Sequence, residues 1–128
     1  MNTDKGQEDH DLTNTIIGCA YTVSNTLGVG FLEKIYENAL LIELKKAGLS
    51  VEQQKAIKVH YNNIIVGDFY CDLLVNSTVI IELKSCKAID DSHLAQCMNY
   101  LKACNIRIGL IINFGKSKVE IKRVILGF

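Results

Sequence analysis

The sequence contains no proline, and no part of it resembles an internal repeat, a low-complexity tract or an interdomain linker. These absences argue against two folded units joined by a flexible connection. The length of 128 residues is also close to the commonest size of one domain. We therefore predict a single domain over residues 12–128, preceded by a polar, acidic and disordered tail over residues 1–11.

Long apolar runs and export signals are missing as well. No stretch approaches the roughly 20 apolar residues that cross a bilayer, and residues 1–11 contain neither a basic nor an apolar signal-peptide region. The five cysteines are odd in number and include no CxxC pair. We therefore expect a cytoplasmic protein without membrane contact, with reduced, buried thiols. A zinc site from His93, Cys97 and Cys104 is the alternative, although its spacing matches no familiar zinc motif.

A charge of one sign is the third absence, since 14 basic residues balance 14 acidic ones. A basic excess is the usual electrostatic mark of a nucleic-acid-binding protein. Without it, the composition argues against tight, passive binding to a phosphate backbone, where affinity comes largely from lysine and arginine. Function must therefore be inferred from a local site.

What the sequence does contain is a change of period, from helical to strand-like and back. The predicted helices cover residues 13–27, 32–47 and 91–104, and the predicted strands cover residues 56–61, 66–75, 78–85, 107–114 and 118–126. The apolar face expected for the second helix consists of Leu32, Ile35, Tyr36, Ala39, Leu40 and Leu44. The order ααβββαββ indicates an α/β fold with a mixed β-sheet flanked by helices.

The second and third predicted strands form a hairpin in this interpretation. Side chains alternate between the two faces of a strand, so pairing the apolar faces fixes the register. The expected pairs are Val75 with Val79, Leu73 with Ile81, and Cys71 with Leu83.

This register places Asp72 opposite Glu82, with Lys84 two residues further along the same face. Facing carboxylates destabilise a sheet unless something compensates their charge. Mg²⁺ is commonly held by one or two carboxylates plus a substrate phosphate, and a neighbouring lysine can orient water or neutralise phosphate charge. The pattern therefore predicts a metal site; a solvated polar face, with Lys84 bridging the carboxylates, is the alternative.

Three further polar residues have two interpretations each. Glu33 lies in the first turn of the second helix, where the helix dipole favours a carboxylate in any case. Gln96 and Tyr100 are four residues apart and share one face of the third helix. Spacing alone explains this pair by ordinary packing or solvation as well as by function.

Several segments resemble the GxxExxY proteins, a family within the PD-(D/E)XK nuclease superfamily. The namesake motif is GFLEKIY, from Gly30 to Tyr36. The segment GDFYCDLLVNSTVIIELKS is similar to the metal-binding hairpin of the family, and HLAQCMNYL and RIGLIINFG are similar to its later segments. The resemblance spans residues 12–125 in the expected order.

The resemblance implies a restriction-endonuclease-like core with a catalytic metal. Asp72 and Glu82 would bind Mg²⁺ or Mn²⁺, and Glu33 would join this acidic cluster. Lys84 would act on the attacking water or on the transition state.

The resemblance also implies roles for Gln96 and Tyr100, which match a glutamine–tyrosine pair near the metal and substrate in some branches of the superfamily. One departure is visible, because Cys71 stands where the name of the superfamily has proline. A proline before Asp72 matters to the name of the superfamily more than to metal binding, so this departure leaves the expected site intact.

We therefore expect a metal-dependent nuclease that hydrolyses phosphodiester bonds, of DNA rather than RNA. A domain of this size has little surface for base readout, which implies weak intrinsic sequence specificity. The alternative is a non-catalytic module that binds nucleic acid or protein and retains the nuclease fold. A homodimer or another protein partner, contacted through Ile125, Leu126 and Phe128, is compatible with either function. The basic residues expected either to hold the flanking backbone or to be solvated are Lys87, Lys116, Lys118, Lys122 and Arg123.

Overall fold

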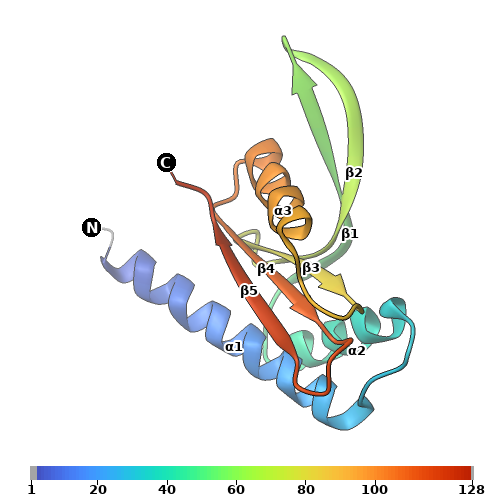
Figure 1. The fold of residues 1–128 in the computed structure, drawn as a ribbon. Coiled ribbons are helices and arrows are strands. Elements are labelled where there is room, and N and C mark those ends of the chain that lie inside the picture. Colours follow the sequence, from blue (N-terminus) through green and yellow to red (C-terminus); the bar gives the residue numbers. More distant parts are fainter. Residues whose placement is uncertain (1–2, 128) are drawn as a thin grey trace.

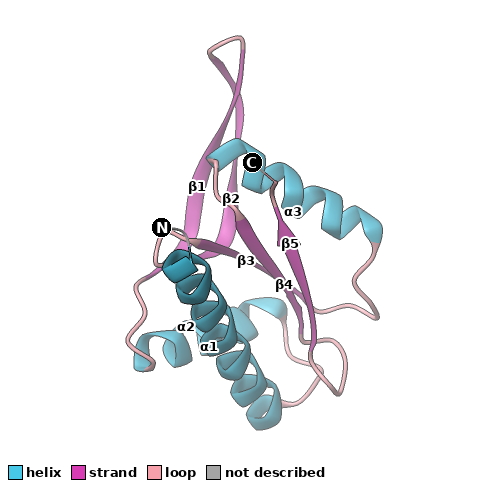
Figure 2. Ribbon diagram, turned by 90° about the vertical axis from the view of Figure 1, so that its left-hand side faces the viewer, coloured by secondary structure: helices cyan, strands magenta, loops and turns pink. Residues whose placement is uncertain are grey.

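The computed structural model describes residues 3–127, which form a five-stranded sheet with helices on both faces (Figures 1 and 2). Their order matches the predicted ααβββαββ order and confirms a mixed sheet flanked by helices. Among these residues no helix is long and apolar enough to cross a membrane. The elements are α1 (Thr3–Leu27), α2 (Glu33–Lys46), β1 (Val51–Tyr61), β2 (Ile64–Val75), β3 (Val79–Lys84), α3 (Asp91–Cys104), β4 (Ile108–Asn113) and β5 (Glu120–Ile125).

The strands lie in the order β1-β2-β3-β4-β5. Only β3 and β4 are parallel, and α3 forms the crossover that a parallel pair requires. Every residue of β4, and all of β3 except its last residue, is buried. Their almost continuous apolar sequence follows from this position, because both faces of these central strands are covered.

The two faces of the sheet have separate cores. Helices α1 and α2 pack on one face and α3 packs on the other (Figures 1 and 2). The buried strand residues on the α1–α2 side include Leu73, Val75, Val79, Ile81, Leu83, Leu110 and Ile112, and those on the α3 side include Ile57, Cys71, Leu74, Ile80, Ile111 and Val124.

The first helix is longer than the sequence predicts. It begins at Thr3 rather than near residue 13, so most of the tail expected to be disordered is helical. The segment has no helix-breaking proline, and pairs four residues apart support the helix: Lys5 forms an ion pair with Asp9, and Gln7 donates a hydrogen bond to Asp11. Residues 1, 2 and 128 lie outside the described part of the chain, and with them the predicted contact through Phe128.

The second helix buries only part of the predicted face, including Tyr36, Leu40 and Leu44. Leu32, directly before the helix, is 77% exposed and Ile35 is 41% exposed, whereas Glu37 is only 2% exposed. The buried face passes through Tyr36, Glu37, Leu40 and Leu44. The helix is therefore rotated relative to the prediction, and the side of Glu37 faces the sheet.

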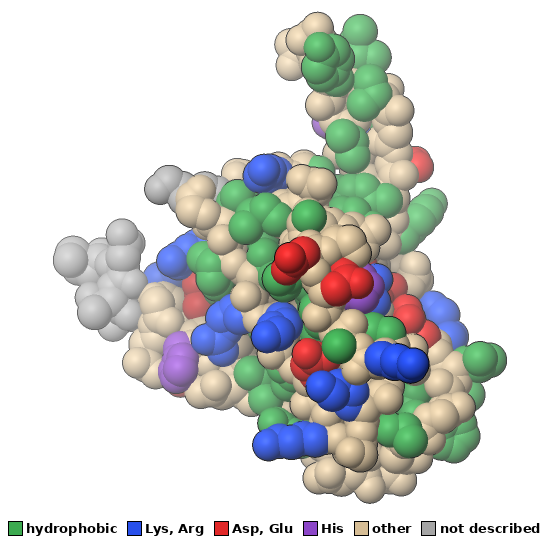
Figure 3. Space-filling model, in the orientation of Figure 1, with side chains coloured by type: hydrophobic (Ala, Val, Ile, Leu, Met, Phe, Trp, Pro, Cys, Tyr) green, Lys and Arg blue, Asp and Glu red, His purple; other side chains and the backbone are tan. Residues whose placement is uncertain are grey.

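The β1–β2 hairpin extends well beyond the predicted strands. Its strands meet at Asn62 and Asn63, whose left-handed φ values of 51° and 63° suit a tight hairpin turn. Only Leu73–Val75 of β2 pairs with β3, so the outer hairpin leaves the sheet as a two-stranded arm. Figure 3 shows this arm standing clear of the body, with apolar side chains at its tip.

Candidate active site

The candidate site lies where β2 separates from β3. The pairing of Val75 with Val79 and of Leu73 with Ile81 is confirmed, and the regular pairing ends there. The predicted pairing of Cys71 with Leu83 is wrong, because Cys71 lies in the core on the α3 side and Leu83 lies in the other core.

An irregularity in β1 explains this change of face. The regular pairing of β1 with β2 omits Gln54 and Asp72, and Gln54 has a left-handed φ of 52°. This conformation is uncommon for a residue other than glycine, asparagine or aspartate. The strict alternation that the prediction used is therefore interrupted at Asp72, where the site begins.

Asp72 and Glu82 come together as predicted, but each holds the main chain of the opposite strand. The backbone N–H of Leu83 donates to Asp72 Oδ2 at 2.8 Å, and the backbone N–H of Asp72 donates to Glu82 Oε2 at 3.0 Å. The two carboxylates thus replace the sheet hydrogen bonds that end at Leu73 and Ile81. Their geometry is fixed by the fold itself.

Both carboxyl groups have raised pKa values. Burial, and after it the negative charge of Asp72, raises the pKa of Glu82 from 4.5 to about 8. Burial also raises the pKa of Asp72, although the hydrogen bond from the Leu83 amide opposes the increase. One buried and one partly buried carboxyl that resist ionisation are suited to receive a cation, which would favour the charged forms of both.

The structure gives the GFLEKIY motif a physical basis. Tyr36 is fully buried and its ring stacks on Phe114 with 4.8 Å between centroids. Its hydroxyl donates to the carbonyl of Gly28 and accepts from the N–H of Phe31 at 3.2 Å, which holds the loop before α2. Gly30 in this loop has a φ of 107°, which favours glycine.

This loop places Glu33 in the first turn of α2, beside the site. Burial raises the pKa of Glu33, and the charge of Asp72 adds to the effect while that of Lys84 opposes it. Glu33 is therefore an electrostatic neighbour of the pair, but it remains exposed at the surface.

Lys84 ends β3 in a partly buried position, and its charge lowers the pKa values of Asp72 and Glu82 against the stronger effects that raise them. The chain beyond it is fixed by Asn113, the residue that pairs with Lys84 on β4. Asn113 is fully buried; its side chain accepts from the N–H of Cys86 and donates to the carbonyl of Cys86, both at 3.0 Å. These bonds hold the segment that leads from Lys84 to α3.

Of the two predicted residues on α3, only Tyr100 is coupled to the carboxylates. Burial raises the pKa of its phenol, and the charges of Glu82 and Asp72 add to this increase. Its ring stacks on Phe69 of β2 with 3.8 Å between centroids. Gln96 lies one turn earlier and is exposed, and the structure gives it no hydrogen bond to another described residue.

Two residues near the pair were not predicted. Glu37, 2% exposed, accepts hydrogen bonds from Lys34, Gln53 and Gln54. Gln54 Nε2 also lies 3.3 Å from Asp72 Oδ1, so it connects the buried Glu37 to the site. A signal for Glu37 exists in the sequence, because it is a charged residue directly beside the buried positions of its helix, but nothing local marks Gln54.

The donor set fits a hard divalent cation in its chemistry, because its members are carboxylate oxygens. Among residues 3–127, however, no three His, Cys, Asp or Glu side chains form a group placed to hold a metal ion. Glu33 is thus near Asp72 and Glu82 without completing a ligand set. The zinc alternative is not assembled in this part of the chain either: His93 Nδ1 accepts the Asp90 N–H at the start of α3.

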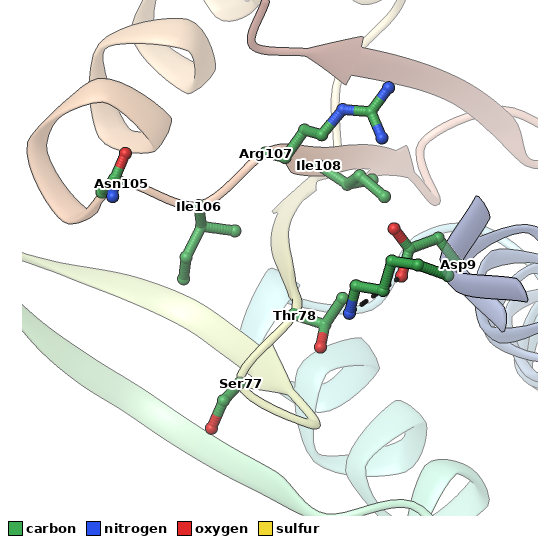
Figure 4. A pocket seen from close by; sticks show the side chains of 8 residues that line it. Asp9, Ser77, Thr78, Asn105, Ile106, Arg107 and Ile108 are labelled. Atoms are coloured by element: carbon green, nitrogen blue, oxygen red, sulfur yellow. Dashed lines mark ion pairs between the residues drawn. The ribbon is translucent and has the colours of Figure 1, made fainter. Parts of the chain in front are cut away.

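Other polar features of the described surface lie away from this pair. A cavity of 280 Å³ is bounded by the first turns of α1, the start of β3 and the segment before β4, where Asp9 pairs with Lys5 at 3.6 Å (Figure 4). None of the predicted site residues lines it. Arg123, one of the basic residues considered for backbone binding, donates a hydrogen bond to Thr13 of α1 at 3.3 Å.

The described geometry thus combines the buried Glu82, the partly buried Asp72 and Lys84, which ends the strand of Glu82, on a mixed sheet with helices on both faces. The sequence model of the PD-(D/E)XK nuclease superfamily matches residues 10–124, and the chain belongs to this superfamily. Nucleases of this superfamily act on nucleic acids, and divalent metals are common cofactors among them.

Two solved structures share the fold. The protein SSO0001 is 13% identical, with 75% of this chain and 51% of that chain covered and a TM-score of 0.58. An alkaline exonuclease from Laribacter hongkongensis is 11% identical, with 84% of this chain and 76% of that chain covered and a TM-score of 0.51. The chain spans about half of SSO0001. The predicted restriction-endonuclease-like α/β core is confirmed. The search of curated proteins finds no match.

Proposed function

We propose that the protein is a metal-dependent nuclease that hydrolyses phosphodiester bonds of DNA in preference to RNA, with weak intrinsic sequence specificity. The observation that carries this proposal is the interlocked pair of Asp72 and Glu82, with pKa values raised by burial, next to the charge of Lys84. Holding two carboxyl groups so close together, with Glu82 buried, is costly when no cation compensates their charge. Binding a cation and a phosphate gives them a function that offsets this cost.

The proposed roles follow from the positions of the side chains. Asp72 and Glu82 would hold Mg²⁺ or Mn²⁺, and a divalent cation there would polarise the scissile phosphate and make an attacking water more acidic. Lys84 would orient that water or neutralise charge that develops on the phosphate. Glu33 would approach the cluster once the charge of the cation attracts it, and Tyr100 would contact substrate beside the pair.

Finer aspects of the proposal depend on the sequence resemblance. We assign the chain to the GxxExxY group, because the loop before α2 gives Gly30 and Tyr36 of GFLEKIY defined structural roles. We retain Gln96 as a substrate-contacting residue because it lies one turn from Tyr100 on the same helix. We also propose a single domain that includes α1 from Thr3 onward, and a cytoplasmic location, in keeping with five free cysteines.

A non-catalytic module that binds nucleic acid or protein is the second candidate. It is favoured by one observation: in the described residues the two carboxylates already serve as main-chain acceptors and no three-member metal group exists. A module of this kind needs no divalent cation. Metal dependence therefore separates the two functions.

The test is a cleavage assay with labelled single- and double-stranded DNA and RNA, in Mn²⁺, Mg²⁺ or EDTA. Glu82→Gln and Lys84→Ala are compared with wild type after circular dichroism has established that both are folded. We expect cutting that requires the metal and is lost in both variants. Cutting that persists in both variants would refute the assigned site. An absence of cutting with every substrate and metal would favour the binding module.

A further inference from the structure

The outer part of the β1–β2 hairpin and the helix α3 face each other across a groove. Beyond Lys55 and Cys71 the hairpin has no neighbouring strand on the β3 side, and it rises past α3 as an arm (Figures 1 and 3). A two-stranded ribbon is marginally stable by itself. Its length is therefore not explained by the stability of the fold.

Two adjoining cavities form this groove, with volumes of 580 Å³ and 330 Å³. They share His60 of the arm and Ala103 of α3 as lining residues. A cavity of the larger size accommodates about one or two nucleotides, while a duplex is far too wide for it.

The larger cavity of the groove approaches the candidate active site through two aromatic residues, although Asp72, Glu82 and Lys84 do not line it. Phe69 of the arm stacks on Tyr100 of α3 at an interplanar angle of 17°, and both line the larger cavity. Phe69 lies three residues before Asp72 on β2. A ligand in the groove thus contacts an aromatic pair whose phenylalanine is on the same strand as Asp72.

The charge of the groove is positive, although the chain as a whole is neutral. Its charged lining residues are Lys55, Lys58 and Lys102, together with His60, and no carboxylate lines either cavity in the described residues. Lys55 is partly neutralised by Glu52 at 3.0 Å. Lys58 and Lys102 form no ion pair among the described residues and are the main cations of the groove, although Asp68 stands opposite Lys58 in the β1–β2 register.

We propose that this groove binds one single strand of nucleic acid and leads it to the cleavage site. Aromatic platforms flanked by lysines bind single strands without reading sequence, because every base has a face that stacks and every nucleotide carries a phosphate. Phe69 and Tyr100 contact a base, and Lys58 and Lys102 neutralise phosphates on either side of the groove. The delivery of the strand to a cleavage site rests on the proposed nuclease function, whereas binding of the strand in the groove does not.

The test measures binding in EDTA, where no cutting interferes, by the fluorescence anisotropy of a labelled oligothymidylate. The double variant Lys58→Gln/Lys102→Gln is compared with the control Lys45→Gln/Lys46→Gln, which removes the same charge from the exposed end of α2. We expect about 10-fold weaker binding in the groove variant. The slope of the logarithm of the binding constant against the logarithm of the salt concentration should become shallower by about 1.4, which is about 0.7 for each lost phosphate contact. We expect the control to bind as wild type does, and Phe69→Leu to weaken binding without changing the salt dependence.

Equal losses in the groove and control variants would overturn the inference, as would tighter binding of duplex than of single strand. Absence of any binding at low salt would also overturn it, and would leave the groove to a protein partner. Failure of the nuclease proposal is distinguishable: groove-dependent binding without metal-dependent cutting would support the groove and refute the enzyme. If the groove variants leave both binding and metal-dependent cutting unchanged, the enzyme is supported and the groove is refuted.

Discussion

The substitution Glu82→Gln is expected to stabilise the metal-free protein at neutral pH. Glu82 is 7% exposed, and burial, followed by the charge of Asp72, raises its pKa from 4.5 to about 8. A pKa that is higher in the folded state means that folding favours the protonated carboxyl. The corresponding stability is complete below about pH 4.5 and is lost as the pH rises towards about 8.

The size of the effect follows from the same values. Between the ordinary pKa of 4.5 and neutral pH lie about 2.5 pH units, and each unit corresponds to about 1.4 kcal/mol. At pH 7 the unfolded chain is ionised at Glu82 whereas folding keeps the carboxyl mostly protonated, so the metal-free protein is about 3 kcal/mol less stable there than at low pH. The glutamine side chain keeps an oxygen for the N–H of Asp72 and carries no charge, so the variant avoids this cost.

Urea unfolding in EDTA at about pH 5 and about pH 7 measures the effect. We expect wild type and variant to differ little in free energy of unfolding at the lower pH, and the variant to be more stable by about 3 kcal/mol at the higher pH. Saturating Mn²⁺ should stabilise wild type much more than the variant. A difference between the two proteins that is the same at both pH values would refute the argument that Glu82 is held protonated by its surroundings.

Three further predictions concern other parts of the chain. Lys84→Ala should fold normally and bind oligonucleotide, but cut it about 100-fold more slowly, as measured in single-turnover reactions; cutting at the wild-type rate would exclude Lys84 from the chemistry. Glu37→Gln, which weakens a buried acceptor of three side chains, should cost about 1–3 kcal/mol in urea unfolding and slow cutting, and unchanged values of both would show that Glu37 is not needed. Gly109→Ala should cost about 1–3 kcal/mol, because its Cβ would lie 2.6 Å from Cys97 Sγ, whereas the control Gly67→Ala meets no atom within 4 Å; equal stability losses would contradict this.

The fold was largely predictable from the sequence because it depends on local periodicity. The two pairs nearest the β2–β3 turn followed from strand alternation. The buried residues Tyr36, Leu40 and Leu44 of α2 followed from the helical period. The errors occurred where tertiary contacts override a local pattern. Leu32 belongs to the apolar pattern but lies exposed, because the rotation of α2 on the sheet depends on the partner surface.

The candidate site was predictable in its members more than in its geometry. Asp72, Glu82 and Lys84 share one hairpin and lie directly beyond its last regular pair, Leu73 with Ile81, so their proximity follows from the hairpin itself. The exchange of main-chain hydrogen bonds depends on the irregularity at Gln54, which belongs to another strand. The pattern of residues within the β2–β3 hairpin therefore does not predict this exchange of hydrogen bonds.

The exchange of hydrogen bonds between Asp72 and Glu82 has a consequence for spectroscopy. The amide protons of Asp72 and Leu83 are held by carboxylate oxygens rather than by carbonyl groups. Their chemical shifts and exchange with solvent should therefore respond to the ionisation of the pair and to a cation that draws electron density from the same oxygens. Two backbone resonances would then follow occupancy of the site directly, in a protein with unmodified side chains and without any substrate.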